Sequence, residues 1–199
     1  VATGYGRVSV PYADKMITEI TCHAMGAVWI FDNKDMTIID IGGQDTKIIC
    51  VEQGFVKDFM MNDKCSAGTG RFLEIMANTL SMRPNEMCEL AREGSGVTIS
   101  SMCTVFAESE VISLIGQGEK KENIAFAVVD SIVRKVAAQA NRMSEDRSML
   151  CLTGGLCECS YISEALTKEL GMEVKTDPQS RYAGAIGAAL GAVKKGKKN

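Results

Sequence analysis

The chain is organised around residues 62–80, NDKCSAGTGRFLEIMANTL. Gly68 and Gly70 loosen the backbone in its first half, which predicts a loop. From Phe72 onward apolar residues recur with helical spacing, so the loop is predicted to run directly into a helix. Cys65 lies just ahead of this helix, where unpaired N–H groups favour a thiolate or another anion. A buried packing cysteine is the alternative interpretation.

A second cysteine, Cys103, also lies at the start of a predicted helix, over 103–115. Two thiolates cannot complete a four-thiolate iron–sulfur site, but two copies of the chain about a two-fold axis would supply four. A four-coordinate zinc site satisfies the same count. Cys157 and Cys159 form a further candidate metal pair. The remaining cysteines lie in apolar stretches and are predicted to be packing residues: Cys22, Cys50, Cys88 and Cys151.

Upstream, residues 37–51 (TIIDIGGQDTKIICV) consist of two β-branched runs on either side of a glycine pair. This pattern predicts a β-hairpin, and residues 55–60 predict a third strand. The turn residues Gly42 and Gly43 would let backbone N–H groups approach a phosphate. The sequence therefore predicts a phosphate-binding turn between the first two strands.

Two side chains at this turn suit phosphate chemistry. Asp40 at the strand end could hold Mg²⁺ through water, and Gln44 could orient an attacking water. The alternative is an ordinary β-turn in which Asp45 and Lys47 face water. His23, the only histidine, is predicted to be a packed or surface residue because no second histidine lies near it.

The rest of the chain alternates helical and extended patterns, which predicts an α/β fold with mixed strand direction. Thr153-Gly154-Gly155 follows a predicted buried strand, where two glycines make room for a flat ligand or a phosphate. The small residues of 182–195 would let another backbone come close. Helices are predicted over 14–28, 83–92, 123–143 (apolar almost all round and therefore buried), 161–170 and 182–195, and strands over 148–152 and 173–176.

Overall composition limits the class of protein. The 199 residues carry a net charge of −3, with a pI of about 5.3, which argues against a nucleic-acid surface. No apolar run approaches a membrane span and no signal peptide is visible, so a cytoplasmic protein with reduced or metal-bound thiols is expected. The chain begins at Val1 without an initiating Met, and we expect it to be cut on its N-terminal side.

These motifs together resemble the activators of 2-hydroxyacyl-CoA dehydratases, a group that also includes ATPase subunits of benzoyl-CoA reductase. The likeness covers nearly the whole chain and keeps its order. The strings NDKCSAGTGRF and CTVFAESE are specific to this group, whereas DIGGQD and TGG are shared with the sugar kinase, heat-shock ATPase and actin superfamily. The strings are NDKCSAGTGRF (62–72), CTVFAESEVIS (103–113), DIGGQDTK (40–47), TGG (153–155) and YAGAIGAALG (182–191).

The resemblance implies an actin, sugar kinase and heat-shock ATPase-like (ribonuclease H-like) α/β fold, with one complete domain and the remainder of a truncated first domain. The expected division is 1–36 as the remnant, 37–180 as the second ATPase domain and 181–199 as a C-terminal crossing helix. Members of the family open with an Asp-x-Gly-Ser-Thr phosphate loop, which does not occur in this sequence.

The resemblance also implies a function. Two subunits would share one [4Fe-4S] cluster through Cys65 and Cys103, and ATP hydrolysis with Mg²⁺ would drive an electron to a partner dehydratase. Ferredoxin or flavodoxin would supply that electron. Asp40 and Gln44 would be catalytic. The cofactor-binding residues would be Gly42, Gly43, Gln44, Gly68, Gly70, Gly154 and Gly155. The alternatives are an ATPase component of a benzoyl-CoA reductase-type enzyme, a cluster-free small-molecule kinase, or a non-catalytic docking fragment.

Overall fold

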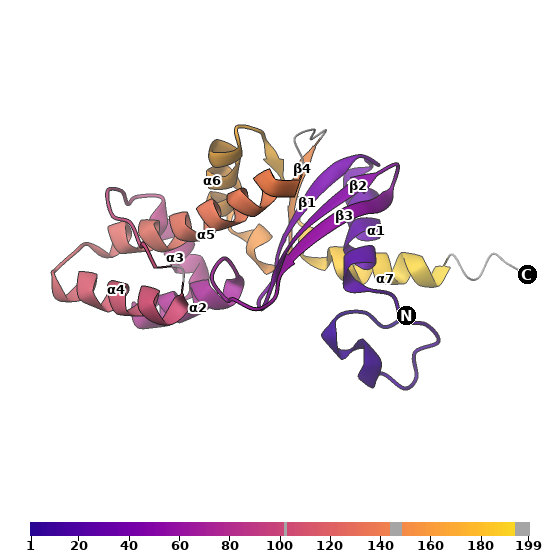
Figure 1. Cartoon of the computed structure of the whole chain (residues 1–199), viewed down its shortest axis with the longest axis horizontal. Coiled ribbons are helices and arrows are strands. Elements are labelled where there is room, and N and C mark those ends of the chain that lie inside the picture. Colours follow the sequence, from indigo (N-terminus) through magenta and orange to yellow (C-terminus); the bar gives the residue numbers. More distant parts are fainter. Residues whose placement is uncertain (102, 144–148, 194–199) are drawn as a thin grey trace, which may run out of the picture.

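A five-stranded sheet of order β3-β2-β1-β4-β5 lies at the centre of the computed structural model, which describes residues 1–101, 103–143 and 149–193 (Figure 1). β1 pairs antiparallel with β2, and β2 with β3, whereas β4 and β5 run parallel to β1. The mixed α/β sheet expected from the sequence is thereby confirmed. The strands are β1 (Met36–Ile41), β2 (Thr46–Glu52), β3 (Phe55–Asn62), β4 (Leu150–Thr153) and β5 (Val174–Lys175).

The predicted hairpin is formed by β1 and β2. Their register pairs Met36 with Val51 and Ile41 with Thr46, so the glycine turn lies between the two strands. Every residue of β1 is buried, because helices cover both faces of the sheet. Successive side chains point to opposite faces: Ile39 packs with the large helical core, whereas Ile38 packs with residues of α1.

Seven α-helices are described around this sheet. Figure 1 shows α1 and α7 together beside the sheet and α2, α3 and α4 at the opposite end of the molecule. None of the helices described is both long and apolar enough to cross a bilayer. The helices are α1 (Glu19–Phe31), α2 (Gly70–Thr79), α3 (Pro84–Ala91), α4 (Thr104–Gly116), α5 (Lys121–Met143), α6 (Ser160–Leu170) and α7 (Ala183–Val193).

The predicted start of the first helix at residue 14 is wrong, because α1 begins at Glu19. Thr18 is the N-cap, and its hydroxyl accepts a hydrogen bond from the Thr21 amide. The preceding residues are extended against the N-terminal segment: the Ala2 amide donates to the Lys15 carbonyl at 2.9 Å. A threonine cap followed by Glu19 in the first turn therefore fixes the helix start.

α5 departs from the sequence prediction in one respect. Its buried face is long and apolar, running from Ile124 to Ala140, but Arg134, Ala138 and Arg142 are exposed. The helix is therefore amphipathic and not apolar all round.

α1 and α7 approach each other closely through glycines. A Cβ added to Gly26 would lie 1.9 Å from the Ala183 carbonyl oxygen, and one added to Gly187 would lie 1.8 Å from the Cys22 carbonyl oxygen. The small residues of the last helix therefore do let another backbone come close. Residues 194 and 195 of that predicted helix lie outside the described residues. The division of the chain at residue 36 stays a prediction.

Candidate functional site

The glycine turn between β1 and β2 is hydrogen-bonded to the start of α2. The Gly70 amide donates to the Gly42 carbonyl at 2.9 Å, and the Arg71 amide donates to the Gly43 carbonyl at 2.8 Å. A Cβ on Gly70 would lie only 3.2 Å from the Gly42 oxygen, so this contact favours glycine. Two amides at the start of α2 are therefore satisfied by the turn and are not free for an anion.

A cavity of about 400 Å³ opens beside this turn, within the range of small-molecule sites. Two arginines on its wall, Arg71 and Arg83, are each paired with a glutamate, Glu74 at 2.7 Å and Glu86 at 2.6 Å, and Glu74 also lines the cavity. The Gln44 side chain belongs to an exposed residue and is accessible to solvent. Five of the predicted cofactor-binding residues line the cavity: Gly42, Gly43, Gln44, Gly70 and Gly155.

The other two predicted cofactor-binding glycines lie elsewhere. Gly154 has a φ of +81°, and its absent Cβ would lie 2.5 Å from the Ile41 carbonyl oxygen, so it lets the ends of β4 and β1 lie together. Gly68 has a φ of +86° and lines a second cavity of about 330 Å³ against α5. Both positions favour glycine because of the left-handed backbone.

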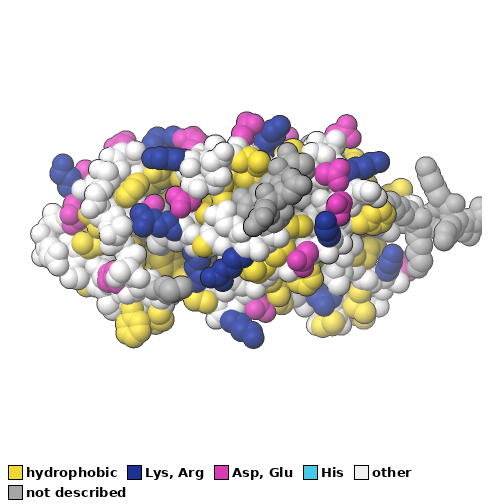
Figure 2. Space-filling model, turned by 45° about the horizontal axis from the view of Figure 1, so that its top comes forward, with side chains coloured by type: hydrophobic (Ala, Val, Ile, Leu, Met, Phe, Trp, Pro, Cys, Tyr) yellow, Lys and Arg dark blue, Asp and Glu magenta, His cyan; other side chains and the backbone are white. Residues whose placement is uncertain are grey.

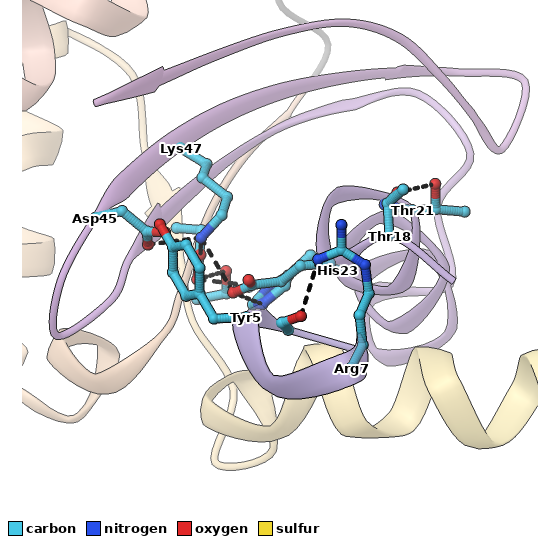
Figure 3. Close-up of polar contacts among 11 residues, drawn as sticks. Tyr5, Arg7, Thr18, Thr21, His23, Asp45 and Lys47 are labelled. Atoms are coloured by element: carbon cyan, nitrogen blue, oxygen red, sulfur yellow. Dashed lines mark hydrogen bonds and ion pairs between the residues drawn. The ribbon is translucent and has the colours of Figure 1, made fainter. Parts of the chain in front are cut away.

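A buried charge network lies under the turn (Figure 3). The Lys47 ammonium lies 2.6 Å from Asp45, 3.1 Å from Glu19 and 3.3 Å from Asp40, and the Tyr5 hydroxyl donates to Asp45 at 3.0 Å. Burial alone would lower the pKa of Lys47, but the three carboxylates outweigh burial and raise it. The alternative in which Asp45 and Lys47 face water is wrong, since they are 4% and 2% exposed.

His23 joins this network from α1 and was missed as a site residue. Its Nε2 lies 3.7 Å from Glu19. Its Nδ1 lies 3.4 Å from Asp40, in a geometry that makes no hydrogen bond, and within the described residues Nδ1 has no hydrogen-bond partner. Burial lowers the pKa of His23, but Asp40 and Glu19 raise it by more. His23, together with the Lys47 ammonium, in turn lowers the pKa of Glu19 to about 2.

The network also contains a possible metal-ligand group. Ligand atoms of Glu19, His23 and Asp40 all lie within 4.8 Å of one another. Asp40 is further held by a hydrogen bond from the Thr153 hydroxyl at 3.0 Å. The nearby Lys47 ammonium already neutralises these carboxylates, which disfavours direct coordination of a metal cation by this group.

The two cysteines singled out from the sequence lie in neighbouring loops. Cys65 is half-buried and Cys103 is exposed. The hydroxyls of the residues that follow them, Ser66 and Thr104, are hydrogen-bonded at 2.6 Å. Cys103 is also the N-cap residue of α4. Five other cysteines are buried: Cys22, Cys88, Cys151, Cys157 and Cys159.

The Cys65 loop is held by side chains from three elements. Asn62, at the end of β3, donates to the Cys65 carbonyl at 2.8 Å. The Thr46 hydroxyl on β2 donates to the Gly68 carbonyl at 2.6 Å, and the Lys135 ammonium on α5 lies 3.6 Å from the Cys65 sulfur. The loop therefore has a defined shape tied to the sheet and to α5.

Cys157 and Cys159 are packed beneath the surface, and Cys159 is hydrogen-bonded to Cys88. That hydrogen bond is the main reason why the pKa of Cys159 is lowered. Within the described ranges neither belongs to a group of three metal-capable side chains, so this part of the chain offers Cys157 and Cys159 no third ligand.

The α/β sheet and its glycine turn have the fold of actin, sugar kinases and Hsp70, and the family match identifies the chain as an ATPase of that fold. The model of the BadF/BadG/BcrA/BcrD ATPase family matches residues 1–192. The chain therefore belongs to the BadF/BadG/BcrA/BcrD ATPase family, as the sequence motifs led us to expect.

Three relatives indicate where in this family the chain lies. It is 48% identical to the (R)-2-hydroxyglutaryl-CoA dehydratase activating ATPase of Acidaminococcus fermentans, over the whole chain and 76% of that relative. The crystal structure of component A of the Acidaminococcus fermentans (R)-2-hydroxyglutaryl-CoA dehydratase superposes with a TM-score of 0.94, covering 99% of this chain and 76% of that one.

The activator of the 2-hydroxyisocaproyl-CoA dehydratase from Clostridium difficile, solved with bound ADPNP, is 39% identical. It has a TM-score of 0.90 and covers 99% of this chain and 76% of that one. One of the subunits of the benzoyl-CoA reductase of Thauera aromatica is 30% identical, over 94% of this chain and 68% of the relative.

A Gly155→Ala variant tests whether the cavity beside the turn binds the nucleotide. An added Cβ would meet no protein atom within 4 Å, so the unliganded fold should tolerate it. Because the methyl group would occupy cavity space, we expect at least about tenfold weaker binding of an ATP analogue, about 1.4 kcal/mol, with an unchanged melting temperature. Isothermal titration calorimetry measures the affinity, and Gly116→Ala, at a residue that does not line the cavity, is the control. Unaltered affinity would contradict this placement of the nucleotide.

Proposed function

We propose that this chain is an acyl-CoA dehydratase activase. In this proposal ATP hydrolysis drives a low-potential electron from a [4Fe-4S] cluster, shared by two copies, to a 2-hydroxyacyl-CoA dehydratase. The observation that carries it is the Ser66–Thr104 hydrogen bond, which holds the loops of Cys65 and Cys103 together. These two cysteines are accessible while most of the others are buried.

The donor set fits such a cluster. When bound, a cluster of this kind accepts and releases one electron at a potential set by its charge and surroundings. Cys65 and Cys103 supply thiolates, and the start of α4 directs its partial positive charge toward Cys103. Two copies complete the four thiolates that one copy lacks.

The surface next to Cys103 favours a homodimer. The first turn of α4 exposes Val105 and Phe106, which are 67% and 66% accessible, and Ile112 and Ile115 are also exposed farther along the helix. Exposed apolar side chains gathered on one helix are typical of a covered surface. A second copy seated here would bury these side chains and bring its own cysteine pair to the same cluster.

The cavity beside the turn is the proposed ATP site. Backbone groups of Gly42 and Gly43 would approach the phosphates, and the bound ADPNP of the Clostridium difficile relative supports a nucleotide in this family. Asp40, held by Lys47 and Thr153, would position Mg²⁺ through water. Gln44 would orient the attacking water.

Hydrogen bonds connect the ATP site with the Cys65 loop. The turn carbonyls of Gly42 and Gly43 accept from the first amides of α2, and Thr46 at the start of β2 donates to Gly68. A shift of the turn on hydrolysis would therefore be passed to the loop that carries Cys65. This connection is the proposed route by which ATP alters the cluster's surroundings.

The partners follow from the same proposal. A 2-hydroxyacyl-CoA dehydratase would accept the electron, and a reduced ferredoxin or flavodoxin in the cytoplasm would supply it. On the face drawn in Figure 2, Lys and Arg side chains are interspersed with Asp and Glu, which does not suit a nucleic-acid partner.

The second candidate function is that of an ATPase component of a benzoyl-CoA reductase-type enzyme, which the Thauera aromatica relative favours.

Cysteine replacements test the cluster. We expect Cys65→Ser and Cys103→Ser each to abolish the visible absorption of anaerobically prepared protein, because each removes two of the four thiolates from a dimer. Cys50→Ser, at a half-buried cysteine on β2, should keep the wild-type spectrum. A wild-type protein that is colourless and binds zinc, or a spectrum unchanged by both replacements, would refute the proposal.

A further inference from the structure

One lysine on α5 points at a proposed cluster ligand. The Lys135 ammonium lies 3.6 Å from the Cys65 sulfur, a hydrogen-bond distance for sulfur. Gly68 leaves room for this lysine, because a Cβ there would lie 3.2 Å from Cδ and 3.4 Å from Cγ of Lys135. The lysine stem thus lies across the loop at the residue with no side chain.

The charge of Lys135 is not taken up by a carboxylate. Among the described residues no ion pair includes Lys135, whereas its neighbour Arg134 pairs with Asp130 at 2.8 Å. The cavity of about 330 Å³ that Lys135 lines has two further cations on its wall, Arg134 and Arg142, and no carboxylate among the described residues that line it. The positive charge is therefore directed at the sulfur.

We propose that Lys135 is a positioning residue that holds Cys65 and raises the reduction potential of the cluster. This inference rests on the proposed function. One-electron reduction adds a negative charge to a cluster that is already anionic, and a nearby ammonium stabilises the reduced form more than the oxidised form. Two copies would place two such lysines on one cluster, one at each Cys65.

A redox titration of the anaerobic, iron-loaded dimer tests this. Dithionite with mediators reduces the cluster by one electron, and electron paramagnetic resonance measures the reduced fraction. At a given potential we expect Lys135→Met to lower the ratio of reduced to oxidised cluster about tenfold, which corresponds to about 59 mV. Lys135→Arg should stay near wild type, and so should Arg134→Met, which removes the adjacent cation.

The outcomes separate this inference from the proposed function. Iron-loaded Lys135→Met with the wild-type potential would overturn the role of Lys135 and leave the cluster intact. Wild-type protein without iron would overturn both. If Lys135→Met does not load, Lys135→Gln replaces it. A cluster kept by Lys135→Arg but lost from both neutral variants supports the positioning role, and loss from all three variants overturns it.

Discussion

Replacing Lys47 with Met is expected to lower the free energy of unfolding by about 3–5 kcal/mol. The Lys47 ammonium is within 3.3 Å of Asp40, Asp45 and Glu19, and both aspartates are almost completely buried. Without the ammonium the two aspartates would be left desolvated, and all three carboxylates would repel one another. Denaturation in urea measures the loss.

The matched control is Lys57→Met, the same substitution in an exposed pair with Glu52 on neighbouring strands. We expect a change of at most about 1 kcal/mol there. Asp45→Asn combined with Lys47→Met should recover part of the lost stability, because one unpaired carboxylate is removed. Equal losses for Lys47→Met and Lys57→Met would show that the buried network does not stabilise the fold.

Gly187→Ala is the second substitution with a large expected effect. We expect it to lower the free energy of unfolding by about 3 kcal/mol or more. The new Cβ would lie 1.8 Å from the carbonyl oxygen of Cys22 on α1, and backbone cannot give way as a flexible side chain can. The two helices would have to separate, which exceeds ordinary overpacking of about 1–3 kcal/mol. The midpoint of thermal or urea unfolding measures the change.

Gly116→Ala provides the control for Gly187→Ala. It is the last residue of α4, and nothing lies within 4 Å of its added Cβ, so we expect no loss and a gain of at most about 0.5–1 kcal/mol. A stability of Gly187→Ala near that of wild type would show that α1 and α7 are not packed as described.

Local patterns predicted much of the fold. The β-branched runs on either side of Gly42 and Gly43 predicted β1 and β2, and the glycine after 161–170 predicted the end of α6, where Gly171 has a left-handed backbone. The start of α1 could not be predicted from local patterns. Its upstream residues contain apolar side chains at helical spacing, but their backbone pairs with Ala2, a contact outside the local sequence.

In the candidate site, too, local spacing was predictable from the sequence, whereas contacts between distant segments were not. Glu19 and His23 are four residues apart on one helix face, a spacing that the sequence displays. That they meet Asp40 and the buried Lys47 depends on how α1 packs beneath β1 and β2 (Figure 3). Periodicity places charged residues toward water by default, so a buried ion network escapes it. Likewise Cys65 and Cys103 were selected by sequence, but their proximity became visible only through Ser66 and Thr104.

The most direct measurement of the central claim is iron and acid-labile sulfide analysis of anaerobically purified wild-type protein, with native mass spectrometry of the same sample. The account predicts a mass of two chains together with about four irons and four sulfides. Protein without iron, or a full cluster on a single chain, would contradict a cluster shared between two copies through Cys65 and Cys103.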